Sequence, residues 1–323
     1  MPDLDLKVAA IDKLTPQIKR FAFVAANGGP LPAFEAGAHI DVFTGNGLTR
    51  SYSLAGDPAD PSRYVTAVLR EPKGGGSTWM HDEVKVGDLL NASGPTNNFP
   101  LDPSAGRHHL IAGGIGITPM LAMGHVLARG EVPFKLDYCT RSVEETAFLD
   151  EVKQVFGNRV TLHHDGGDPK KGIDLKATLA ERPDNTHLYL CGPAGLLRAA
   201  REAARHWPDK AVHYELFSSA LSDHERAEMK ARANEPFEIE LAQSGLTLTV
   251  PADKTILEVL NENGIEVIKV CEEGYCGTCQ VPLLGGKADH RDEVLDDEEK
   301  AANNLIQVCI SRALPGEKLV LDL

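Results

Sequence analysis

Four of the six cysteines lie near the carboxyl end of the 323-residue sequence, at a spacing that suits an iron–sulfur cluster. Cys271, Cys276 and Cys279 follow the pattern C-x4-C-x2-C, and 29 residues separate Cys279 from Cys309. In plant-type [2Fe–2S] sites, one loop of this spacing supplies three thiolates and a distant segment supplies the fourth. A structural zinc site more often has two C-x2-C pairs, and disulfides are disfavoured in the cytosol. The sequence therefore predicts a [2Fe–2S] cluster.

Two segments of the first hundred residues combine groups that could hold a phosphate and a flavin ring. The first is Arg50-Ser51-Tyr52-Ser53-Leu54, and the second is the glycine run that contains Gly75, Gly76 and Ser77. The Arg50 guanidinium could bind a phosphate in a bidentate manner, and Tyr52 could lie against an isoalloxazine face. The glycine run precedes a helical pattern, whose free N–H groups could bind a phosphate. An ordinary barrel strand and a flexible turn are the alternative interpretations.

Two glycine-containing segments follow predicted strands in the middle of the chain. Gly113-Gly114-Ile115-Gly116-Ile117-Thr118-Pro119 follows an apolar strand, and Cys191-Gly192-Pro193 ends another. The first segment is not G-x-G-x-x-G and is weak evidence alone, but such a loop brings backbone amides close to a pyrophosphate. Cys191 could also be a structural buried thiol. Arg141 and Ser142 could favour NADPH, whereas Asp165 could bind the ribose hydroxyls of NADH.

Residues 237–323 resemble a plant-type ferredoxin domain with a β-grasp fold. The 217 residues before the linker resemble the ferredoxin–NADP reductase superfamily, in which R-x-Y-S-L, GGIGITP and CGP are family motifs. The domain order, with the ferredoxin at the carboxyl end, is similar to the phthalate dioxygenase reductase family, which includes vanillate demethylase reductases. The resemblance covers essentially the whole chain.

The resemblance implies a cofactor and a set of residues for each site. It implies FMN as the flavin, adds Ala67 to the flavin site and has Phe217 cover the flavin. It favours NADH and places the CGP segment beside the nicotinamide. The expected FMN residues are Arg50, Ser51, Tyr52, Ser53, Ala67, Gly75, Gly76, Ser77 and Phe217. The expected NAD residues are Gly113, Gly114, Gly116, Thr118, Thr140, Arg141, Asp165, Cys191, Gly192 and Pro193.

Three domains are needed to position these groups. Short alternating runs with turns between them, in residues 1–103, predict an antiparallel β-barrel that binds FMN. Strand–helix alternation in residues 104–217 predicts a parallel sheet for the NAD domain. Residues 218–235 are interpreted as a linker, and 236–323 as the ferredoxin domain. The predicted segments, in that order, are Leu6–Ile11, Ile18–Val24, His39–Phe43, Leu48–Leu54, Tyr64–Leu69, Trp79–Val84, His108–Ala112, Met120–Arg129, Phe134–Cys139, Glu145–Phe156, Val160–His163, Leu188–Cys191, Ala194–His206, Phe237–Leu241, Leu246–Val250 and Thr255–Asn263.

Composition and charge limit the partners. The formal net charge of −14 disfavours nucleic acid, and no run of about 18 apolar residues is present to span a membrane. The amino terminus lacks the pattern of a signal peptide, so a cytoplasmic location is expected. Residues 236–323 hold 17 Asp and Glu against 7 Lys and Arg, a net of −10. This excess could be a solvated surface, or it could be a docking face for a basic partner.

The three predicted sites form one electron path. A nicotinamide gives two electrons as hydride and a [2Fe–2S] cluster accepts one at a time, so a flavin is expected between them. The expected function is hydride transfer from NADH to FMN, then single-electron transfer through the cluster to a Rieske-type oxygenase. No catalytic acid or base is expected, and the family implies a monomer. A free-standing reductase of quinone, ferric iron or another small acceptor is the alternative. A non-catalytic redox carrier is disfavoured by the intact motifs.

Overall fold

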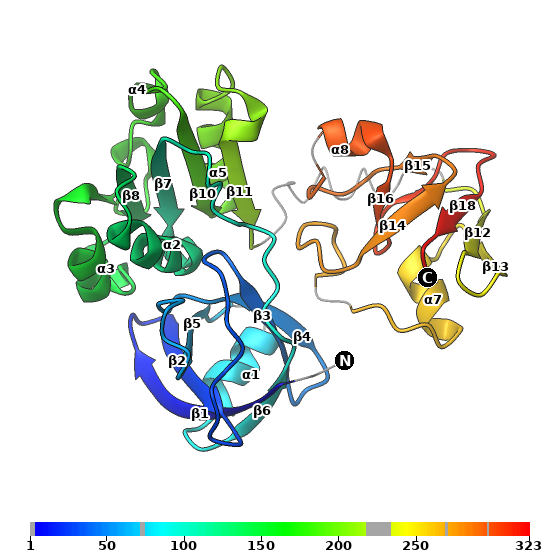
Figure 1. Cartoon of the computed structure of the whole chain (residues 1–323), viewed down its shortest axis with the longest axis horizontal. Helices are drawn as coiled ribbons and strands as arrows, with labels where there is room; N and C mark the ends of the chain where they lie inside the picture. Colours follow the sequence, from blue (N-terminus) through cyan, green and yellow to red (C-terminus); the bar gives the residue numbers. More distant parts are fainter. Residues whose placement is uncertain (1–3, 72–74, 218–233, 269–270, 296) are drawn as a thin grey trace. The chain divides into compact units, whose positions relative to one another are not determined.

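The computed structural model describes residues 4–71, 75–217, 234–268, 271–295 and 297–323 (Figure 1). The chain divides into two compact units, Met1–Phe217 and Ser218–Leu323. Most of the predicted linker, up to residue 233, lies outside the described residues. The division into residues 1–103, 104–217, 218–235 and 236–323 stays a prediction. Among the described helices, none combines the length and the apolar composition that crossing a bilayer requires.

The first unit begins with a six-stranded antiparallel sheet that curls into a barrel. Its strand order is β4-β3-β6-β1-β2-β5. The two ends of this order meet where the Ala55 N–H donates to the Val65 carbonyl oxygen at 2.7 Å. Apolar side chains such as Leu6, Val8 and Phe21 fill the barrel. The elements are β1 (Leu4–Lys13), β2 (Ile18–Ala25), β3 (His39–Phe43), β4 (Thr49–Ser53), β5 (Tyr64–Leu69), α1 (Gly76–Asp82) and β6 (Leu89–Ala92).

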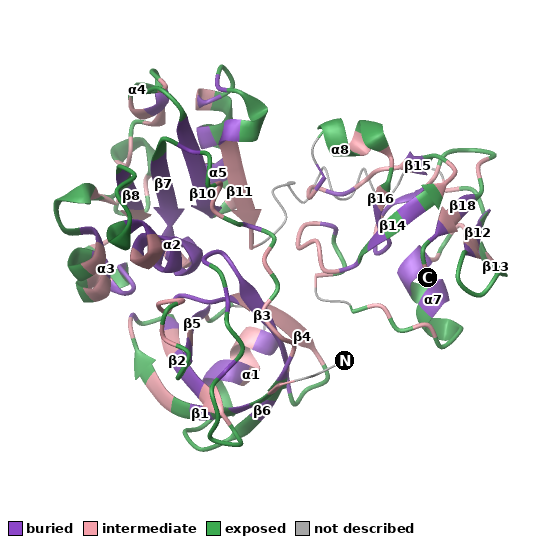
Figure 2. Cartoon of the chain, in the orientation of Figure 1, coloured by how far each residue is buried: buried purple, intermediate pink, exposed green. Residues whose placement is uncertain are grey.

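The rest of the first unit is a five-stranded parallel sheet with the order β11-β10-β7-β8-β9. Its central strands β7 and β10 are almost wholly buried, as Figure 2 shows, because helices pack over the sheet. The elements are β7 (Arg107–Gly113), η1 (Gly114–Gly116), α2 (Ile117–Arg129), β8 (Phe134–Thr140), η2 (Val143–Glu145), α3 (Leu149–Phe156), η3 (Gly157–Arg159), β9 (Val160–His164), η4 (Pro169–Lys171), α4 (Leu175–Leu179), β10 (Thr186–Gly192), α5 (Ala194–Ala203), η5 (Asp209–Ala211) and β11 (Val212–Leu216).

The barrel and the parallel sheet share one hydrophobic core. Ala55 and Ala67 of the barrel belong to the same buried cluster as Leu110 of β7 and Met120 of α2. Ion pairs at the surface add to this contact, since Arg129 of α2 lies 2.7 Å from Asp57. The first unit therefore holds its two sheets in a fixed relation, which a site built from both requires.

The second unit is built on a mixed five-stranded sheet with the order β13-β12-β18-β14-β16. In β12, Phe237, Ile239 and Leu241 point inward while Glu238 is exposed, which is the alternation expected of a half-buried strand. The helix α7 packs its apolar face on this sheet. The elements are β12 (Phe237–Leu241), β13 (Leu246–Val250), α7 (Ile256–Glu262), β14 (Gln280–Gly285), β15 (Ala288–Asp289), α8 (Asp297–Ala302), β16 (Leu305–Gln307), β17 (Arg312–Ala313) and β18 (Leu319–Leu321).

The predicted fold class is confirmed, including the antiparallel barrel, the parallel sheet and the small carboxyl-terminal sheet. All five predicted barrel strands and all four predicted parallel strands are present within a few residues of their expected ends. The sequence analysis missed the strands β6 and β11 and most of the second unit after α7. These segments are short or mostly polar, so they carry little periodicity.

Candidate functional site

The predicted phosphate and flavin residues converge on one side of the barrel. Arg50 on β4 packs directly on the first turn of α1. The contact is so close that a Cβ atom added to Gly76 would lie 2.4 Å from the Arg50 Cγ. A Cβ on Gly75 would lie 3.7 Å from the Arg50 Nη2. Gly75 has a φ of 97°, a conformation that favours glycine. The fold thus brings backbone amides and a guanidinium together, as a phosphate site requires.

Tyr52 supports a flavin at this position. Its hydroxyl group is buried and has no hydrogen-bond partner in the described part of the chain. Burial also raises the pKa of the Tyr52 phenol well above its usual value. An orphaned buried hydroxyl is costly, so a bound group that accepts its hydrogen bond fits here.

The other expected flavin residues contribute in different ways. The Ser51 hydroxyl donates to Asp41 Oδ1 at 2.5 Å, and Ser77 Oγ accepts from the Glu71 N–H at 3.2 Å. The Ser51 hydroxyl hydrogen is therefore engaged within the barrel, whereas the Ser77 hydroxyl can still donate to another group. Ala67 is buried, and Phe217 packs against the core cluster that contains it.

The nucleotide motifs meet at the carboxyl ends of neighbouring strands. The chain runs from β7 outward to β9 in one direction and returns to β10 on the other side of β7. This is the topological switch point, where α/β sheets bind ligands. A Cβ on Gly116 would lie 2.2 Å from the Cys191 carbonyl oxygen, and one on Gly113 would lie 2.6 Å from Pro193 Cδ. Only glycine allows this approach.

The remaining expected NAD residues lie along the same edge. Thr140 ends β8, and its hydroxyl lies 2.9 Å from His164 Nδ1 and 2.8 Å from Thr146 Oγ1. The Gly166 N–H donates to the Arg141 carbonyl oxygen at 2.9 Å, so the Arg141 loop lies beside the turn of Asp165. Thr118 is buried, and its hydroxyl donates to the Ile115 carbonyl oxygen at 3.1 Å. Thr140 and Thr118 therefore have roles within the fold, and Arg141 is an exposed cation at this edge.

Sequence reasoning missed Glu215 on β11. The Ser53 hydroxyl donates to Glu215 Oε2 at 3.3 Å, and the Cys191 thiol lies 4.0 Å from the same oxygen. This carboxyl group therefore joins the flavin motif to the nucleotide motif. Burial raises the pKa of Glu215 to about 8. It also raises the pKa of the Cys191 thiol, with the Glu215 charge adding to the effect.

In the second unit, the four predicted ligands form a chain of thiols. The Cys276 and Cys309 thiols both approach Cys271, where their hydrogen bonds lower the pKa of the Cys271 thiol, and Cys309 also approaches Cys279. All four cysteines are free of disulfides. Gly274 and Gly277 have φ values of 79° and 78°, which let the loop turn tightly.

Backbone amides of this loop point at sulfur. The Glu273 N–H donates to Cys271 Sγ at 3.4 Å, and the Thr278 N–H and hydroxyl both approach the Cys276 thiol. Thiolates that receive such hydrogen bonds are the usual ligands of a [2Fe–2S] cluster, whose potential these bonds adjust. The donor set therefore fits the cluster.

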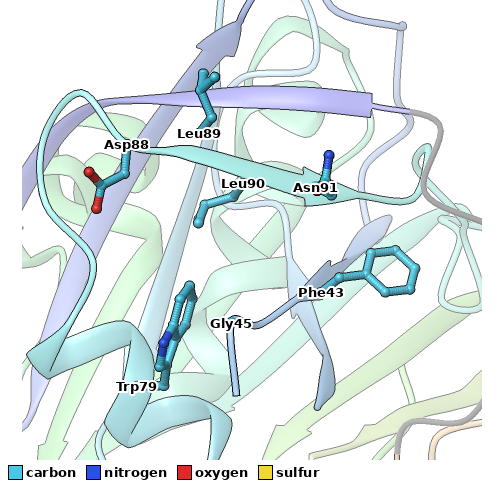
Figure 3. A pocket seen from close by; sticks show the side chains of 7 residues that line it. All are labelled: Phe43, Gly45, Trp79, Asp88, Leu89, Leu90 and Asn91. Carbon is cyan, nitrogen blue, oxygen red and sulfur yellow. The ribbon is translucent and has the colours of Figure 1, made fainter. Parts of the chain in front are cut away.

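A further hollow of about 310 Å³ opens on the outside of the barrel. Phe43, Gly45, Trp79 and the residues 88–91 line it, and Trp79 and Leu90 approach one another across it (Figure 3). None of the residues predicted for FMN or NAD lines this hollow. It adjoins the predicted flavin residues through α1, which carries both Gly76 and Trp79, and through β3, where Phe43 pairs with Thr49.

Comparisons with known proteins agree with this arrangement. Residues 239–314 match the family of 2Fe-2S iron-sulfur cluster binding domains. The phthalate dioxygenase reductase of Burkholderia cepacia is 43% identical over 99% of this chain and 97% of its own length. The vanillate O-demethylase oxidoreductase of a Pseudomonas species is 40% identical over 99% of this chain and 100% of its own length.

Two solved structures cover nearly the whole chain. A phthalate dioxygenase reductase, described as a modular structure for electron transfer from pyridine nucleotides to [2Fe–2S], has a TM-score of 0.72 at 43% identity, with 99% and 98% of the chains covered. An intact type IV self-sufficient cytochrome P450 monooxygenase has a TM-score of 0.88 at 40% identity. This chain covers 41% of that longer protein, which covers 99% of this chain.

The barrel, the parallel sheet and the cluster-binding domain define an oxidoreductase of the iron–sulfur flavoprotein class. Within that class, the chain belongs to the phthalate dioxygenase reductase family. The family expected from the motifs is confirmed. The individual residues assigned to FMN and NAD stay predictions, although the structure brings the Arg50, Gly113 and Cys191 segments into one unit.

Proposed function

We propose that this protein is the reductase component of an oxygenase system. It would take electrons from NADH and deliver them singly to an oxygenase. The observation that carries the proposal is the union, in one chain, of the switch-point motifs, the flavin motif and the four-cysteine loop. Relatives that align over the whole chain are named as reductases or oxidoreductases of phthalate dioxygenase and vanillate O-demethylase.

The residues of the first unit would bind and orient the reactants. Arg50 and the amides of Gly75 and Gly76 would hold the FMN phosphate, and Tyr52 would donate to the flavin. Gly113, Gly116 and Gly192 let the turn after β7 pack closely on the end of β10. The backbone amides of both motifs would then lie beside a nicotinamide nucleotide bound at these strand ends. When bound, FMN supplies the ability to accept a hydride and to release its electrons one at a time.

Cofactor preference is proposed as NADH. Asp165 follows β9, where a carboxylate can accept hydrogen bonds from ribose hydroxyls, and it would repel the 2′-phosphate of NADPH. Arg141, on the neighbouring loop, opposes this preference because its guanidinium could bind the 2′-phosphate of NADPH. Comparing kcat/KM for NADH and NADPH in the wild type and in Asp165→Asn tests it. We expect NADH to be favoured and the preference to narrow in the variant. A wild-type preference for NADPH would contradict it.

The acceptor is proposed to be a Rieske-type oxygenase that binds through the acidic second unit. Glu272 and Glu273 are exposed on the cluster loop itself, between the first two ligand positions. Negative charge beside the point of electron exit would draw in a basic partner surface. The P450 relative shows that a reductase with this fold also occurs joined to a haem monooxygenase. We propose that the protein is cytoplasmic and monomeric. Analytical ultracentrifugation of the holoenzyme tests its oligomeric state.

Anaerobic titration of the purified holoenzyme with NADH, followed by absorbance and electron paramagnetic resonance, tests the electron path. We expect both flavin and cluster bands to bleach, a rhombic signal to appear, and FMN to be the flavin released on denaturation. Cys309→Ser should retain the flavin bleaching and lose the native cluster signal. If wild-type flavin is reduced while an intact cluster stays oxidised, the proposed path is wrong, and a simple flavin reductase becomes the better description.

A further inference from the structure

Three histidines share one face of the parallel sheet at its amino-terminal edge. His108, His187 and His213 are each the second residue of their strand, β7, β10 and β11. In the strand register, His187 pairs with His108 and Tyr189 pairs with His213. Because His187 and Tyr189 are two residues apart, their side chains lie on the same face. The three imidazoles therefore gather at the end of the sheet opposite to the nucleotide motifs.

Asp102 brings a carboxylate to this group from the segment that joins the barrel to β7. Its N–H donates to the Tyr189 hydroxyl at 2.7 Å, which fixes the segment against the sheet. Ser104 donates to Asp102 Oδ1 through its N–H at 2.8 Å and its hydroxyl at 2.7 Å. The second oxygen, Oδ2, lies 3.5 Å from His187 Nδ1. One oxygen is thus held in place while the other faces the imidazoles.

The ligand atoms lie close to the spacing that a metal ion requires. His187 Nδ1 and His213 Nε2 lie 2.9 Å apart, and one ligand atom from each of Asp102, His187 and His213 falls within 4.8 Å of the others. Ligands of a tetrahedral zinc ion with bonds of about 2.0–2.1 Å lie roughly 3.3 Å apart. The two ring planes are nearly parallel, at 19°, and the 2.9 Å between the nitrogens fits one shared proton. Metal binding would turn both rings and move that proton to another ring nitrogen.

His108 supplies a possible fourth ligand. Its Nδ1 atom is buried without a hydrogen-bond partner in the described part of the protein. Burial lowers the pKa of both His108 and His213 to about 4, so both offer neutral lone pairs near pH 7. The charges of Arg182 and Lys210 act on His187 and oppose a cation, whereas Asp102 favours one.

We propose that Asp102, His187 and His213, with His108 as the fourth ligand, bind a divalent transition-metal ion of the zinc type. Three imidazoles and one carboxylate suit Zn²⁺, which binds His nitrogen and Asp oxygen in four-coordinate sites. The site lies at the opposite edge of the sheet from Gly113 and Cys191, so its role is structural. The ion would tie the segment between the two sheets of the first unit to β10 and β11.

Zinc titration of the chelator-treated holoenzyme, with its cluster intact, tests the proposal. We expect calorimetry to give one equivalent bound, and zinc X-ray absorption to show nitrogen and oxygen neighbours at about 2.0–2.1 Å with imidazole scattering. His213→Gln should weaken binding at least tenfold. The matched control is His163→Gln, since His163 also donates to a carboxylate, Asp137 Oδ1, at 2.8 Å but belongs to no such convergent group among the described residues.

Three outcomes would overturn the proposal: no binding by the wild type, sulfur scattering around the zinc, or undiminished affinity in His213→Gln. A thermal measurement provides a second readout, since a ligand that binds only the folded state raises the unfolding temperature. At one fixed zinc concentration, the unfolding temperature should rise in the wild type and His163→Gln, and should rise clearly less in His213→Gln. If His213→Gln fails to fold, Asp102→Asn serves instead, because an amide oxygen can still accept from Ser104.

Discussion

Glu215 is the residue at which the two halves of the first unit become chemically connected. Its carboxyl group receives a hydrogen bond from Ser53 of the barrel and lies beside Cys191 of the parallel sheet. The pKa of about 8 means that this group is mostly protonated at neutral pH. It can therefore place a neutral hydrogen-bonding group beside Ser53 of the predicted flavin site without adding a negative charge there.

The pH dependence of flavin reduction should reveal this group. As pH rises through about 8, Glu215 becomes a carboxylate and opposes the arrival of negative charge at the flavin. Reduction by NADH in stopped flow should therefore slow over that range in the wild type. Glu215→Gln carries no charge at any pH and should lack this decline. The same decline in the variant would contradict the assignment, and Glu151→Gln, at a surface ion pair with Arg20, is the control.

The same group affects stability with a definite sign. Its folded pKa of about 8 lies above the ordinary value of 4.5, so the folded state binds more protons than the unfolded state between these limits. Stability from this source is complete below about pH 4.5 and is lost as pH rises through about 8. The melting temperature of Glu215→Gln minus that of the wild type should therefore be larger at pH 9 than at pH 5.

Site residues were predictable from sequence where they belong to a contiguous motif. Arg50, Gly113 and Cys191 each sit in such a motif. So do Cys271, Cys276 and Cys279, whereas Cys309 was predicted from its distance to these three. Glu215 is a single glutamate in a short strand, and no pattern in the sequence distinguishes it from a solvent-facing glutamate. Only the fold places it beside Ser53. Its one signal was its place two residues before Phe217. Asp102 and the three histidines carry no local pattern, because only strand register brings them together.

At the scale of elements, the close contact between the η1 turn and the end of β10 defines the nucleotide edge. Gly116 faces the Cys191 carbonyl so closely that a methyl group cannot be accommodated without a shift of backbone. Four of the five strands of this sheet were predictable because buried parallel strands are apolar runs. The fifth, β11, is only partly buried along its length and was not predicted. The contact itself was not, since it depends on which strand lies beside β7.

Gly116→Ala should disrupt this edge. The added Cβ would lie 2.2 Å from the Cys191 oxygen, so we expect a loss of about 1–3 kcal/mol of unfolding free energy, typical of overpacking, and weaker NADH binding. Thermal unfolding and the dissociation constant for NADH measure the two effects. Gly195→Ala is the matched control: a Cβ there meets nothing within 4 Å, and alanine favours the helix α5. Equal behaviour of the two variants would refute the argument.

In the second unit, the capping box of α7 offers a second test at this scale. The Glu258 N–H donates to Thr255 Oγ1 at 3.1 Å, and the Thr255 N–H donates to Glu258 Oε2 at 2.7 Å. Thr255→Ala should cost about 1 kcal/mol of unfolding free energy, since one helix N–H loses its partner. Thr255→Ser keeps the hydroxyl and should stay near the wild type. The temperature at which the cluster absorbance is lost measures the stability of both variants. If the stability of Thr255→Ala equals that of the wild type, water replaces the capping hydroxyl.

At the scale of the whole molecule, the chain separates electron uptake from electron delivery. The first unit carries the flavin and nucleotide motifs, and the second carries the cluster loop and a net formal charge of −10 over residues 236–323. The domain order was predictable because the cysteine spacing and the glycine motifs are separate in sequence. The topology of the second unit was harder to predict, since its short strands β14, β16 and β18 pair across long sequence separations.

Electron delivery to a basic oxygenase should therefore depend on the acidic loop at the cluster. Glu273→Lys changes the charge of that exposed loop by two units and should slow delivery about tenfold at low ionic strength, the lower range of electrostatic steering. Added salt should slow the wild type and shrink the difference, because exposed charges are screened. Stopped-flow reduction of the oxygenase measures this rate.

Glu238→Lys makes the same charge change on β12, away from the cluster loop, and should have a much smaller effect. NADH-dependent ferricyanide reduction should be nearly equal in all three proteins, which separates docking from internal electron transfer. If both lysine variants slow delivery equally, total charge rather than the cluster loop guides the partner.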